Sequence, residues 1–342
     1  MHKTRVAVVR GGPSNEYEVS LKTGAAVLKN LPEKYHGEDI LVSKAGEWHC
    51  RGEVVAPHWV ARHFDVAWNA MHGSYGEDGK VQHLLESLHM PFTGSHAYPS
   101  AAAMNKLVAK DYFRQHGIRT PYAVYIEESR DADFIADEVF KQVAPPWVIK
   151  PVSSGSSVGM SIARNRAELI HGIHHAFEHD HAVFVEQYLR GREATCGVVD
   201  SFRGKEHYAL LPIEIIPPKR KVPPVQGPPS LDGHYQPLQS PLSFFDYKSK
   251  YDGSTQEICP GKFTSAEKRQ IEELATKIHQ ALGLRHYSRS DFIVTPRGIY
   301  ALEVNTLPGL TEESLLPKAI RAVGSSYPEF LDHILMLALN ER

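Results

Sequence analysis

The fold is decided by residues 287–305, which read Tyr-Ser-Arg-Ser-Asp-Phe-Ile-Val-Thr-Pro-Arg-Gly-Ile-Tyr-Ala-Leu-Glu-Val-Asn. Two runs rich in β-branched and aromatic residues, 287–294 and 299–305, flank a Pro-Arg-Gly turn. Such runs around a short glycine-containing turn predict a β-hairpin. We take as its register that Thr295 faces Ile299 across the turn.

This register brings four polar side chains to one face of the hairpin. Asp291 lies opposite Glu303, and Arg289 lies opposite Asn305; side chains alternate along a strand, so all four point the same way. Directly opposed carboxylates repel each other unless a cation lies between them. Oxygen ligands on a rigid frame suit Mg²⁺, which also binds phosphate. The stretch therefore predicts a magnesium–nucleotide site, with a solvent-facing strand of ordinary charges as the alternative.

The bulk composition is that of a soluble globular protein. The chain has 342 residues, 42% hydrophobic and 23% charged, and this length predicts roughly two or three domains. A net charge of −2 provides no field that would attract nucleic acid or a membrane surface. No apolar run of about 18 residues is present, and the N-terminus lacks a signal-peptide pattern. We therefore expect a cytoplasmic protein with no nucleic-acid or membrane partner.

The cysteines and histidines predict neither a disulfide framework nor a metal site. Cys50, Cys196 and Cys259 lie far apart, are odd in number and match no zinc spacing, which fits a reducing cytoplasm. The 20 histidines are scattered, and we interpret most of them as surface residues.

The N-terminal part has the pattern of a doubly wound α/β sheet. Residues 4–10 predict a buried strand, a glycine-rich turn follows, and 18–31 has a helical pattern. The next strand, 64–71, runs into His-Gly-Ser-Tyr-Gly-Glu-Asp-Gly at 72–79. Because open α/β sheets bind ligands at the carboxyl ends of their strands, 72–79 is a candidate ligand loop; a plain surface loop is the alternative.

Lysines and a glycine-rich segment follow. Residues 100–116 predict one helix, in which Lys106 and Lys110 lie four apart and by themselves indicate a solvated basic face. A short apolar strand ends at Lys150, and the Ser/Gly-rich segment 153–159 follows it. Small residues with free N–H groups can surround phosphates, and a lysine can reach phosphate as a point charge. This is no P-loop, because the Gly-Lys-Ser/Thr ending is missing; a Gly/Ser hairpin is the alternative.

The rest of the chain mixes helical and strand patterns. Residues 217–241 contain eight prolines and no periodicity, and we interpret them as an irregular surface excursion. Helical patterns cover 166–179, 264–282, 312–323 and 330–339. Strand patterns cover 182–188, 193–199 and 208–216, and we expect the last two strands to continue an antiparallel sheet.

Seven short motifs stand in the order found in one enzyme family. They are Glu18-Val19-Ser20, His72-Gly73-x-x-Gly76-Glu77-Asp78-Gly79, Met104-Asn105-Lys106, Gly155-Ser156-Ser157-Val158-Gly159, Lys250-Tyr251, Arg289-x-Asp291 and Glu303-Val304-Asn305-Thr306-x-Pro308-Gly309-x-Thr311. With these motifs the chain resembles, over nearly its whole length, the D-alanine–D-alanine ligases of the ATP-grasp superfamily.

The resemblance implies an α/β fold of the α+β ATP-grasp type. A Rossmann-like N-terminal domain would span 1–95, a central ATP-grasp domain 96–188, and a C-terminal ATP-grasp domain with the lid loop and the metal and substrate site 189–342. The second and third lobes would clasp ATP between their sheets. The family also suggests a homodimer.

The resemblance also implies a reaction. ATP phosphorylates the carboxylate of one D-alanine to an acyl phosphate, and the amino group of a second D-alanine attacks it, releasing phosphate and the dipeptide for peptidoglycan synthesis. A ligase of the same fold with D-lactate, D-serine or an L-amino acid as second substrate is the alternative, although a tyrosine beside Lys250 resembles the dipeptide-forming branch. A non-catalytic ATP-binding module is a third reading, which the retained lysines and metal ligands disfavour.

For the nucleotide, the resemblance implies the following sites. Asp291, Glu303 and Asn305 match the ligands of Mg²⁺, with two ions expected and Mn²⁺ able to substitute. Lys106 and Lys150 match the phosphate-contacting lysines, which reverses the solvated reading of Lys106. The loop 155–159, with Ser157, would cover the phosphates. The remaining nucleotide contacts would be Glu186, Gln187, Leu189, Glu193 and Lys250.

For the two amino acids, the resemblance implies a second set. Glu18 would hold the ammonium of the first D-alanine, with Ser156 and Tyr251 as hydrogen-bonded partners and His72 beside that subsite. Residues 247–260 would form a lid that keeps water from the acyl phosphate. The oxyanion and the second D-alanine would be held by Arg289, the Gly309 N–H, Ser314 and Leu315.

Some positions depart from the family pattern. Gln82-His83 stands where Gln-Gly is usual, Ser288 replaces a glycine, and Ser153-Ser154 replaces a charged pair. The segment 217–241 is longer than the usual connection before the lid. The lid register is therefore open, and Tyr247 could take the place of Tyr251.

Overall fold

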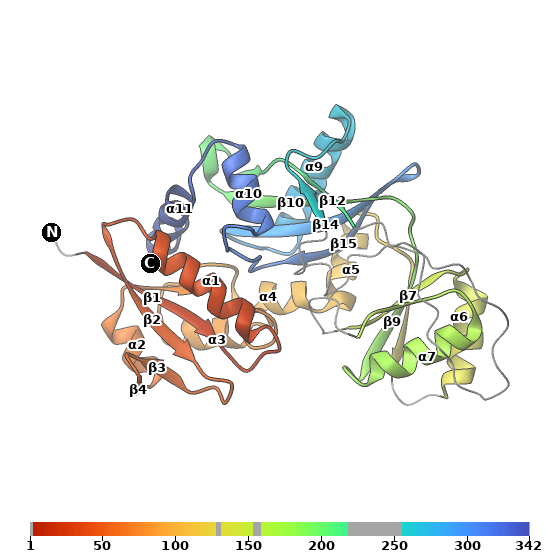
Figure 1. Cartoon of the computed structure of the whole chain (residues 1–342), viewed down its shortest axis with the longest axis horizontal. Coiled ribbons are helices and arrows are strands. Elements are labelled where there is room, and N and C mark those ends of the chain that lie inside the picture. The colour runs from red at the N-terminus through yellow and green to blue at the C-terminus, as the bar shows by residue number, and fades with distance from the viewer. Residues whose placement is uncertain (1–2, 128–130, 153–158, 218–254, 342) are drawn as a thin grey trace.

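The computed structural model describes residues 3–127, 131–152, 159–217 and 255–341, which form three lobes, each built on its own β-sheet (Figure 1). The segment 218–241 and the motif residues 153–158 and 247–254 lie outside the described residues. Within the described ranges, no helix is both long and apolar enough to cross a bilayer.

The first sheet confirms the predicted strand–turn–helix opening. Its strand order is β4-β3-β2-β1-β5, and β1 pairs in parallel with both β2 and β5. The strands β2 to β4 and helix α2 were not predicted, because their polar and apolar residues do not alternate regularly. The elements are β1 (Thr4–Gly11), α1 (Tyr17–Asn30), β2 (Tyr35–Val42), β3 (Trp48–Cys50), β4 (Glu53–Val54), α2 (Pro57–His63), β5 (Val66–Asn69) and α3 (Lys80–Ser87).

The two C-terminal helices share one buried core with the first sheet and with residues of the third sheet, among them Val199 and Tyr287. The helices are α10 (Leu315–Ala322) and α11 (Tyr327–Asn340), and α11 lies close to α1 in Figure 1. Phe330 and Ile334 share a buried core with Val8 and Trp68 of the first sheet. Since full burial of one such side chain contributes about 1.5–3 kcal/mol, the end of the chain stabilises its beginning.

The prediction of one helix over 100–116 is wrong. Two helices, α4 (Ala97–Met104) and α5 (Lys106–Gln115), meet at Asn105, whose φ of −80° and ψ of 106° are extended. The Asn105 side chain accepts hydrogen bonds from the N–H groups of Leu107 and Val108. It thus caps α5, and the local competition of an asparagine side chain with the helix backbone ends α4.

The second sheet is antiparallel, with the order β6-β9-β7-β8. Trp147, Ile149, Leu169 and Ile173 belong to a core that two helices form against one face of this sheet. Because side chains alternate along β7 and β9, the other face carries Lys150 and Glu186. The elements are β6 (Ala123–Glu127), α6 (Ala132–Gln142), β7 (Trp147–Pro151), β8 (Ser161–Ala163), α7 (Arg166–Phe177) and β9 (Ala182–Gln187).

The third sheet has the order β13-β12-β10-β14-β15, with β11 paired to β10, and all its pairs are antiparallel as predicted. The predicted strand 208–216 is divided into β11 and β12. The elements are β10 (Arg192–Asp200), a short 3₁₀ turn (Phe202–Gly204), β11 (His207–Ala209), β12 (Ile213–Ile216), β13 (Gln256–Ile258), α9 (Ser265–Ala281), β14 (Tyr287–Thr295) and β15 (Gly298–Asn305).

The apolar side chains of helices α4 and α5 pack on this third sheet. Ala103 and Phe113 share a buried core with Ile271 of α9 and Ala301 of β15. The division into 1–95, 96–188 and 189–342 therefore stays a prediction, because the helices that open its second range contribute to the core of its third.

Candidate active site

The predicted face of the hairpin is present, although the turn register is wrong by one residue. Thr295 pairs with Gly298 instead of Ile299. A β-bulge then places Leu302 as an extra residue in β15, and beyond it Asp291 lies opposite Glu303. Arg289 likewise lies opposite Asn305. The bulge thus offsets the one-residue difference at the turn, and both carboxylates lie on one face of the hairpin.

The Asp291 carboxylate is the centre of this face. Arg289 donates to it twice, from Nε to Oδ1 at 3.0 Å and from Nη2 to Oδ2 at 2.8 Å. Thr195 of β10 donates to Oδ1 at 2.6 Å, and Asn305 Nδ2 lies 3.4 Å from Oδ2. Burial opposes the charge of Arg289, but Asp291 and Glu303 together raise its pKa above the ordinary value.

These residues fit a divalent cation. Two carboxylates and an amide, on strands held in register, offer the hard oxygen donors that Mg²⁺ prefers. Asn305 uses its Nδ2 toward Asp291, so its Oδ1 is the atom that could serve as an oxygen donor. Thr195, which the sequence did not single out, fixes the orientation of Asp291.

The second sheet contributes a buried cluster of opposite charges. Lys150 Nζ lies 2.8 Å from one oxygen of Glu186, and Lys110 Nζ lies 2.9 Å from the other. Lys110 also donates to Thr120 Oγ1 at 2.7 Å. Although burial acts to raise the pKa of Glu186, the two lysines hold it below its usual value. Lys106 Nζ lies 3.5 Å from the carbonyl oxygen of Val152, beside this cluster.

The solvated interpretation of Lys110 is therefore wrong. Its side chain is only 1% exposed, and burial lowers its pKa to about 8 in spite of the neighbouring Glu186 carboxylate. Helical spacing placed Lys106 and Lys110 on one side of α5 but could not show that the second sheet covers that side. Glu186, predicted as a contact of the nucleotide, has each carboxylate oxygen beside a lysine.

Three other predicted nucleotide contacts lie where the second sheet passes into the third. Gln187 ends β9 and is exposed, Leu189 lies in the connection, and Glu193 is in β10. The Gln187 N–H donates to the carbonyl of Tyr122 at 2.9 Å, which anchors the start of the connection. The segment thus connects the second sheet to the third.

In the first lobe, Glu18 is part of helix α1 and His72 packs beside this helix. Glu18 is exposed in the first turn, and the Nε2 atom of the buried His72 lies 2.8 Å from Thr23 Oγ1. Burial lowers the pKa of His72, while Glu16 acts in the opposite direction. Ser20 accepts from Gly11 N–H at 2.7 Å and donates to the Ala70 carbonyl at 2.9 Å, so α1 is tied to the ends of β1 and β5.

Glu77 connects the first lobe to the loop after the hairpin, a role that the sequence did not reveal. Its carboxylate accepts from Gly73 N–H at 2.8 Å and from Leu307 N–H at 3.2 Å. Burial, helped by Glu16, raises its pKa to about 8. Leu307 lies two residues before Gly309, so Glu77 holds the backbone on which Gly309 is placed.

The predicted dock for a carboxylate lies at the start of α10. Ser314 precedes the helix, and its Oγ accepts from the Thr311 N–H at 3.1 Å. A Cβ at Gly309 would lie 3.0 Å from that Oγ, so a glycine lets the chain pass close to Ser314. The first N–H groups of a helix, here beginning at Leu315, form an anion site.

Four predicted site residues, Ser156, Ser157, Lys250 and Tyr251, lie outside the described residues. The predicted groups that are described come from all three lobes: the hairpin face, the second sheet with the start of α5 and the connection to β10, α1 with its neighbouring loops, and the segment that leads into α10.

Two β-sheets with lysines on one and an acidic oxygen-donor set on the other, beside a Rossmann-like lobe, define an ATP-dependent ligase of the ATP-grasp type. The family model described as D-ala D-ala ligase C-terminus matches residues 113–336, and the one described as D-ala D-ala ligase N-terminus matches 52–95. The chain belongs to the D-alanine–D-alanine ligase family.

Curated relatives match over nearly their full length. The D-alanine–D-alanine ligase of Syntrophobacter fumaroxidans is 37% identical over 341 residues, covering 99% of both chains. That of Desulfotalea psychrophila is 36% identical, covering 99% of this chain and 96% of its own.

Solved structures of related ligases have the same fold over nearly the whole chain. The VanG D-Ala:D-Ser ligase from Enterococcus faecalis superposes with a TM-score of 0.81 at 29% identity, covering 98% of this chain and 100% of its own. The D-alanine–D-alanine ligase from Bacillus anthracis complexed with ATP has a TM-score of 0.76 at 31% identity, with 99% and 98% covered.

Proposed function

We propose that the protein joins two D-alanine molecules into D-alanyl-D-alanine at the expense of ATP, for peptidoglycan synthesis. A carboxylate is a poor acyl donor, so phosphorylation supplies a leaving group. One carboxylate oxygen attacks the γ-phosphorus as ADP departs, and the amine of the second D-alanine then attacks the carbonyl carbon as phosphate departs. The full-length similarity to D-alanine–D-alanine ligases supports these substrates.

One observation carries the phosphoryl-transfer half of the proposal. Asp291 and Glu303 are directly opposed on β14 and β15, with Asn305 beside them. Such a pair is electrostatically unfavourable by itself and favourable around a cation. Mg²⁺, when bound by these residues, would neutralise phosphate charge. Two ions, or Mn²⁺ in their place, would fit the same donors.

The phosphates would be held from the second sheet. Lys106 and Lys150 are nearly buried, at 8% and 6% exposure, so their charges act in a medium where water screens them little. Glu186 steadies Lys150 at 2.8 Å and keeps the cluster from carrying two uncompensated charges. Gln187, Leu189 and Glu193 would border the adenine and ribose; Ser157 and Lys250 would complete the nucleotide site.

The first D-alanine would lie between α1 and the hairpin. Glu18 offers an exposed carboxylate for its ammonium, and His72 lies against the same helix. Ser156 and Tyr251 are proposed as partners of Glu18. Arg289, already oriented by Asp291, would turn its charge toward the developing oxyanion.

The second D-alanine would dock at the start of α10. Its carboxylate would meet Ser314 and the N–H of Leu315, where the partial positive charge of the helix end is favourable. The Gly309 N–H would be the other oxyanion donor. Residues 247–260 are proposed as the lid that excludes water.

A different second substrate is the competing proposal. The similarity to the VanG D-Ala:D-Ser ligase favours testing D-serine first. The groups proposed above act on the shared acyl phosphate and on a carboxylate, which D-alanine, D-serine and D-lactate all supply. Selectivity for one of these second substrates must therefore come from contacts with the parts in which they differ, namely the side chain and the amino or hydroxyl group.

The decisive experiment is a substrate panel. The protein is incubated with ATP, Mg²⁺ and D-alanine, alone or with D-serine, D-lactate or L-alanine, and products are identified by mass. We expect D-alanyl-D-alanine as the main product. A mixed product that predominates at equal concentrations would support the alternative, and no amino-acid-dependent phosphate release would refute ligase activity.

We also propose a homodimer and a cytoplasmic location, as the family resemblance suggests. The three cysteines are free thiols, which accords with a reducing compartment. Sedimentation of the purified protein tests the dimer.

A further inference from the structure

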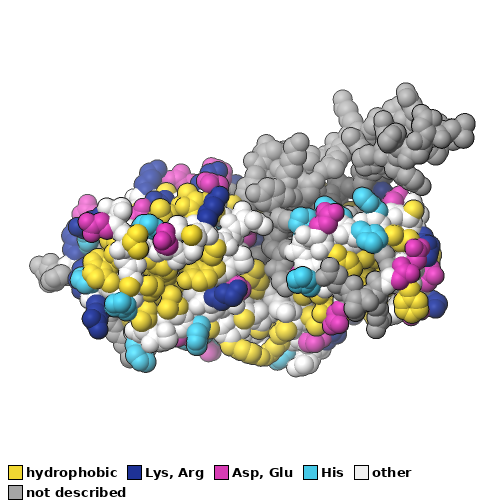
Figure 2. Space-filling view, turned by 90° about the horizontal axis from the view of Figure 1, so that it is seen from below, with side chains coloured by type: hydrophobic (Ala, Val, Ile, Leu, Met, Phe, Trp, Pro, Cys, Tyr) yellow, Lys and Arg dark blue, Asp and Glu magenta, His cyan; other side chains and the backbone are white. Residues whose placement is uncertain are grey.

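The end of α7 is unusually rich in histidine. From Ala167 to Leu189 every fixed charge is acidic, and no lysine or arginine occurs. Figure 2 shows histidine side chains gathered on the surface of the lobe that carries this helix. Five of them fall within eleven residues: His171, His174, His175, His179 and His181.

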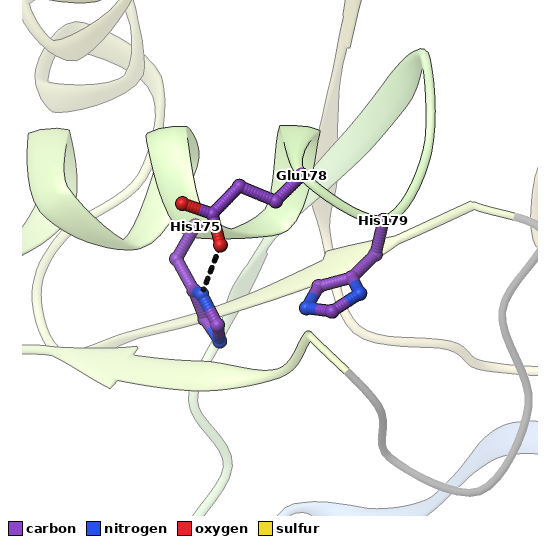
Figure 3. Close-up of side chains that lie close together, drawn as sticks. All are labelled: His175, Glu178 and His179. Atoms are coloured by element: carbon purple, nitrogen blue, oxygen red, sulfur yellow. Dashed lines mark hydrogen bonds and ion pairs between the residues drawn. The ribbon is translucent and has the colours of Figure 1, made fainter.

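Three side chains of this segment converge. One ligand atom from each of His175, Glu178 and His179 lies within 4.8 Å of those of the other two. His175 and His179 are four apart, and Figure 3 shows both rings on the same side of the helix end. Glu178 Oε2 lies 3.2 Å from His175 Nδ1 and joins that ring to the group.

The ring of His179 is held in place by packing. A Cβ at Gly159, whose φ is +71°, would lie 2.6 Å from His179 Cδ2 and 2.8 Å from Pro151 Cγ. The ring therefore occupies space that any side chain at 159 would need. The two histidine rings lie edge to face with centroids 5.2 Å apart. One ligand is thus positioned in advance, which lowers the entropy cost of binding.

We propose that His175, Glu178 and His179 bind Zn²⁺ at a site separate from the proposed magnesium site. Two imidazoles and a carboxylate are ligands that suit zinc, with water in the remaining position. The carbonyl groups at the end of α7 (Phe177) favour a cation there. Tetrahedral ligation needs the ligand atoms roughly 3.3 Å apart, and Glu178 is exposed, so its carboxylate can rotate toward the two rings.

The site is remote from the proposed chemistry. Helix α7 packs on the face of the second sheet that carries Trp147 and Ile149, whereas Lys150 and Glu186 point from the opposite face. Zinc at α7 therefore lies on the other side of the sheet from these lysine and glutamate side chains, and its nearest approach to the proposed nucleotide site is the contact of the His179 ring with Gly159, the last residue of loop 155–159.

A second cluster within the described residues has similar ligand spacing but a sufficient internal explanation. Asp200 Oδ1 lies 2.7 Å from His207 Nδ1 and 3.1 Å from His279 Nε2. His279 Nδ1 lies 2.8 Å from Ser288 Oγ, so each of the two histidine rings is already paired within the protein. It serves as a control site.

The test is calorimetric titration of full-length, untagged protein with Zn²⁺ in millimolar Mg²⁺, which occupies the oxygen-donor site. His175→Ala and His179→Ala should each weaken one zinc equivalent at least about tenfold, as loss of a ligand requires. His174→Ala, an exposed neighbour outside the cluster, and His207→Ala should keep it. Binding should also weaken from pH 7.5 to pH 5.5, because the ligating imidazoles must be neutral.

Unchanged zinc affinity in both cluster variants, or a loss confined to His207→Ala, would overturn the proposal. Because the altered side chains lie at the surface, thermal unfolding of the zinc-free variants should match the parent. Ligase activity of His175→Ala in Mg²⁺ should also be unchanged, so failure of the zinc site is distinguishable from failure of the proposed function.

Discussion

Asp291 and Glu303 face each other across β14 and β15 because Leu302 is an extra residue in the second strand. Without this bulge, the observed turn pairing would place Leu302 opposite Asp291 and would turn Glu303 to the other face. The bulge thus places the second carboxylate, and Asn305 after it, on the side of the proposed metal.

The first prediction concerns this acidic pair. Glu303→Gln should lower kcat at least about a hundredfold, because lost charge stabilisation of about 3 kcal/mol corresponds to that factor. The measurement is phosphate release against Mg²⁺ concentration. Glu206→Gln is the matched control, because the Glu206 side chain is 88% exposed, and it should leave kcat unchanged. Near-parental turnover of Glu303→Gln at saturating Mg²⁺ would remove Glu303 from the metal site.

The second prediction concerns Lys110. Lys110→Met leaves Glu186 buried with Lys150 as its remaining lysine partner among the described residues, so we expect about 3 kcal/mol of destabilisation and a Tm lower by roughly 5–10 °C. The KM for ATP should rise, because Glu186 then draws Lys150 more strongly. Calorimetry and steady-state kinetics measure the two effects.

The double variant Lys110→Met/Glu186→Gln is the control for this interpretation. It removes the buried carboxylate together with its cation, so part of the lost Tm should return. Parental Tm and KM in Lys110→Met would instead support the solvated position that helical spacing indicated.

The third prediction concerns the break between α4 and α5. Asn105→Ala removes the cap of α5 and should cost about 1 kcal/mol. Because Lys106 is the next residue, the KM for ATP should rise as well. Asn165→Ala, which removes the cap of α7, should cost similar stability without changing that KM. Equal kinetic effects from both variants would make the Asn105 result a general consequence of instability.

The fourth prediction concerns the proton on Glu77. Its pKa is raised to about 8 by burial and by Glu16, whereas an unfolded glutamate titrates near about 4.3. Between these values the folded state holds more protons, so this contribution to stability is complete at low pH and is lost as the pH rises to about 8. Glu77→Gln should shrink the stability loss between pH 5 and pH 9 by up to about 4 kcal/mol.

Urea midpoints measured across that pH range test how steeply the free energy of unfolding changes with pH, rather than its absolute value. The slope is the proper readout because a glutamine also keeps only one acceptor for the N–H groups of Gly73 and Leu307. Parallel pH profiles for parent and variant would show that Glu77 is ionised in the folded protein.

The opening strand–turn–helix, several of the later helices, and the hairpin that carries Asp291 and Glu303 followed from the sequence by itself. These features depend on periodicity and turn chemistry, which act over a few residues. The family motifs then indicated which polar groups to expect in one site, and the family matches confirmed that resemblance.

Tertiary structure decided which of those groups are paired and how. Lys110 and Glu186 are 76 positions apart, and Glu77 and Leu307 are 230 apart. No local pattern encodes such contacts, because burial and charge pairing depend on which surfaces the lobes bring together. The same holds for Leu302. Side-chain alternation predicted that Asp291 and Glu303 share a face, but the turn pairing and the bulge at Leu302 that produce this arrangement were decided by the pairing of β14 with β15.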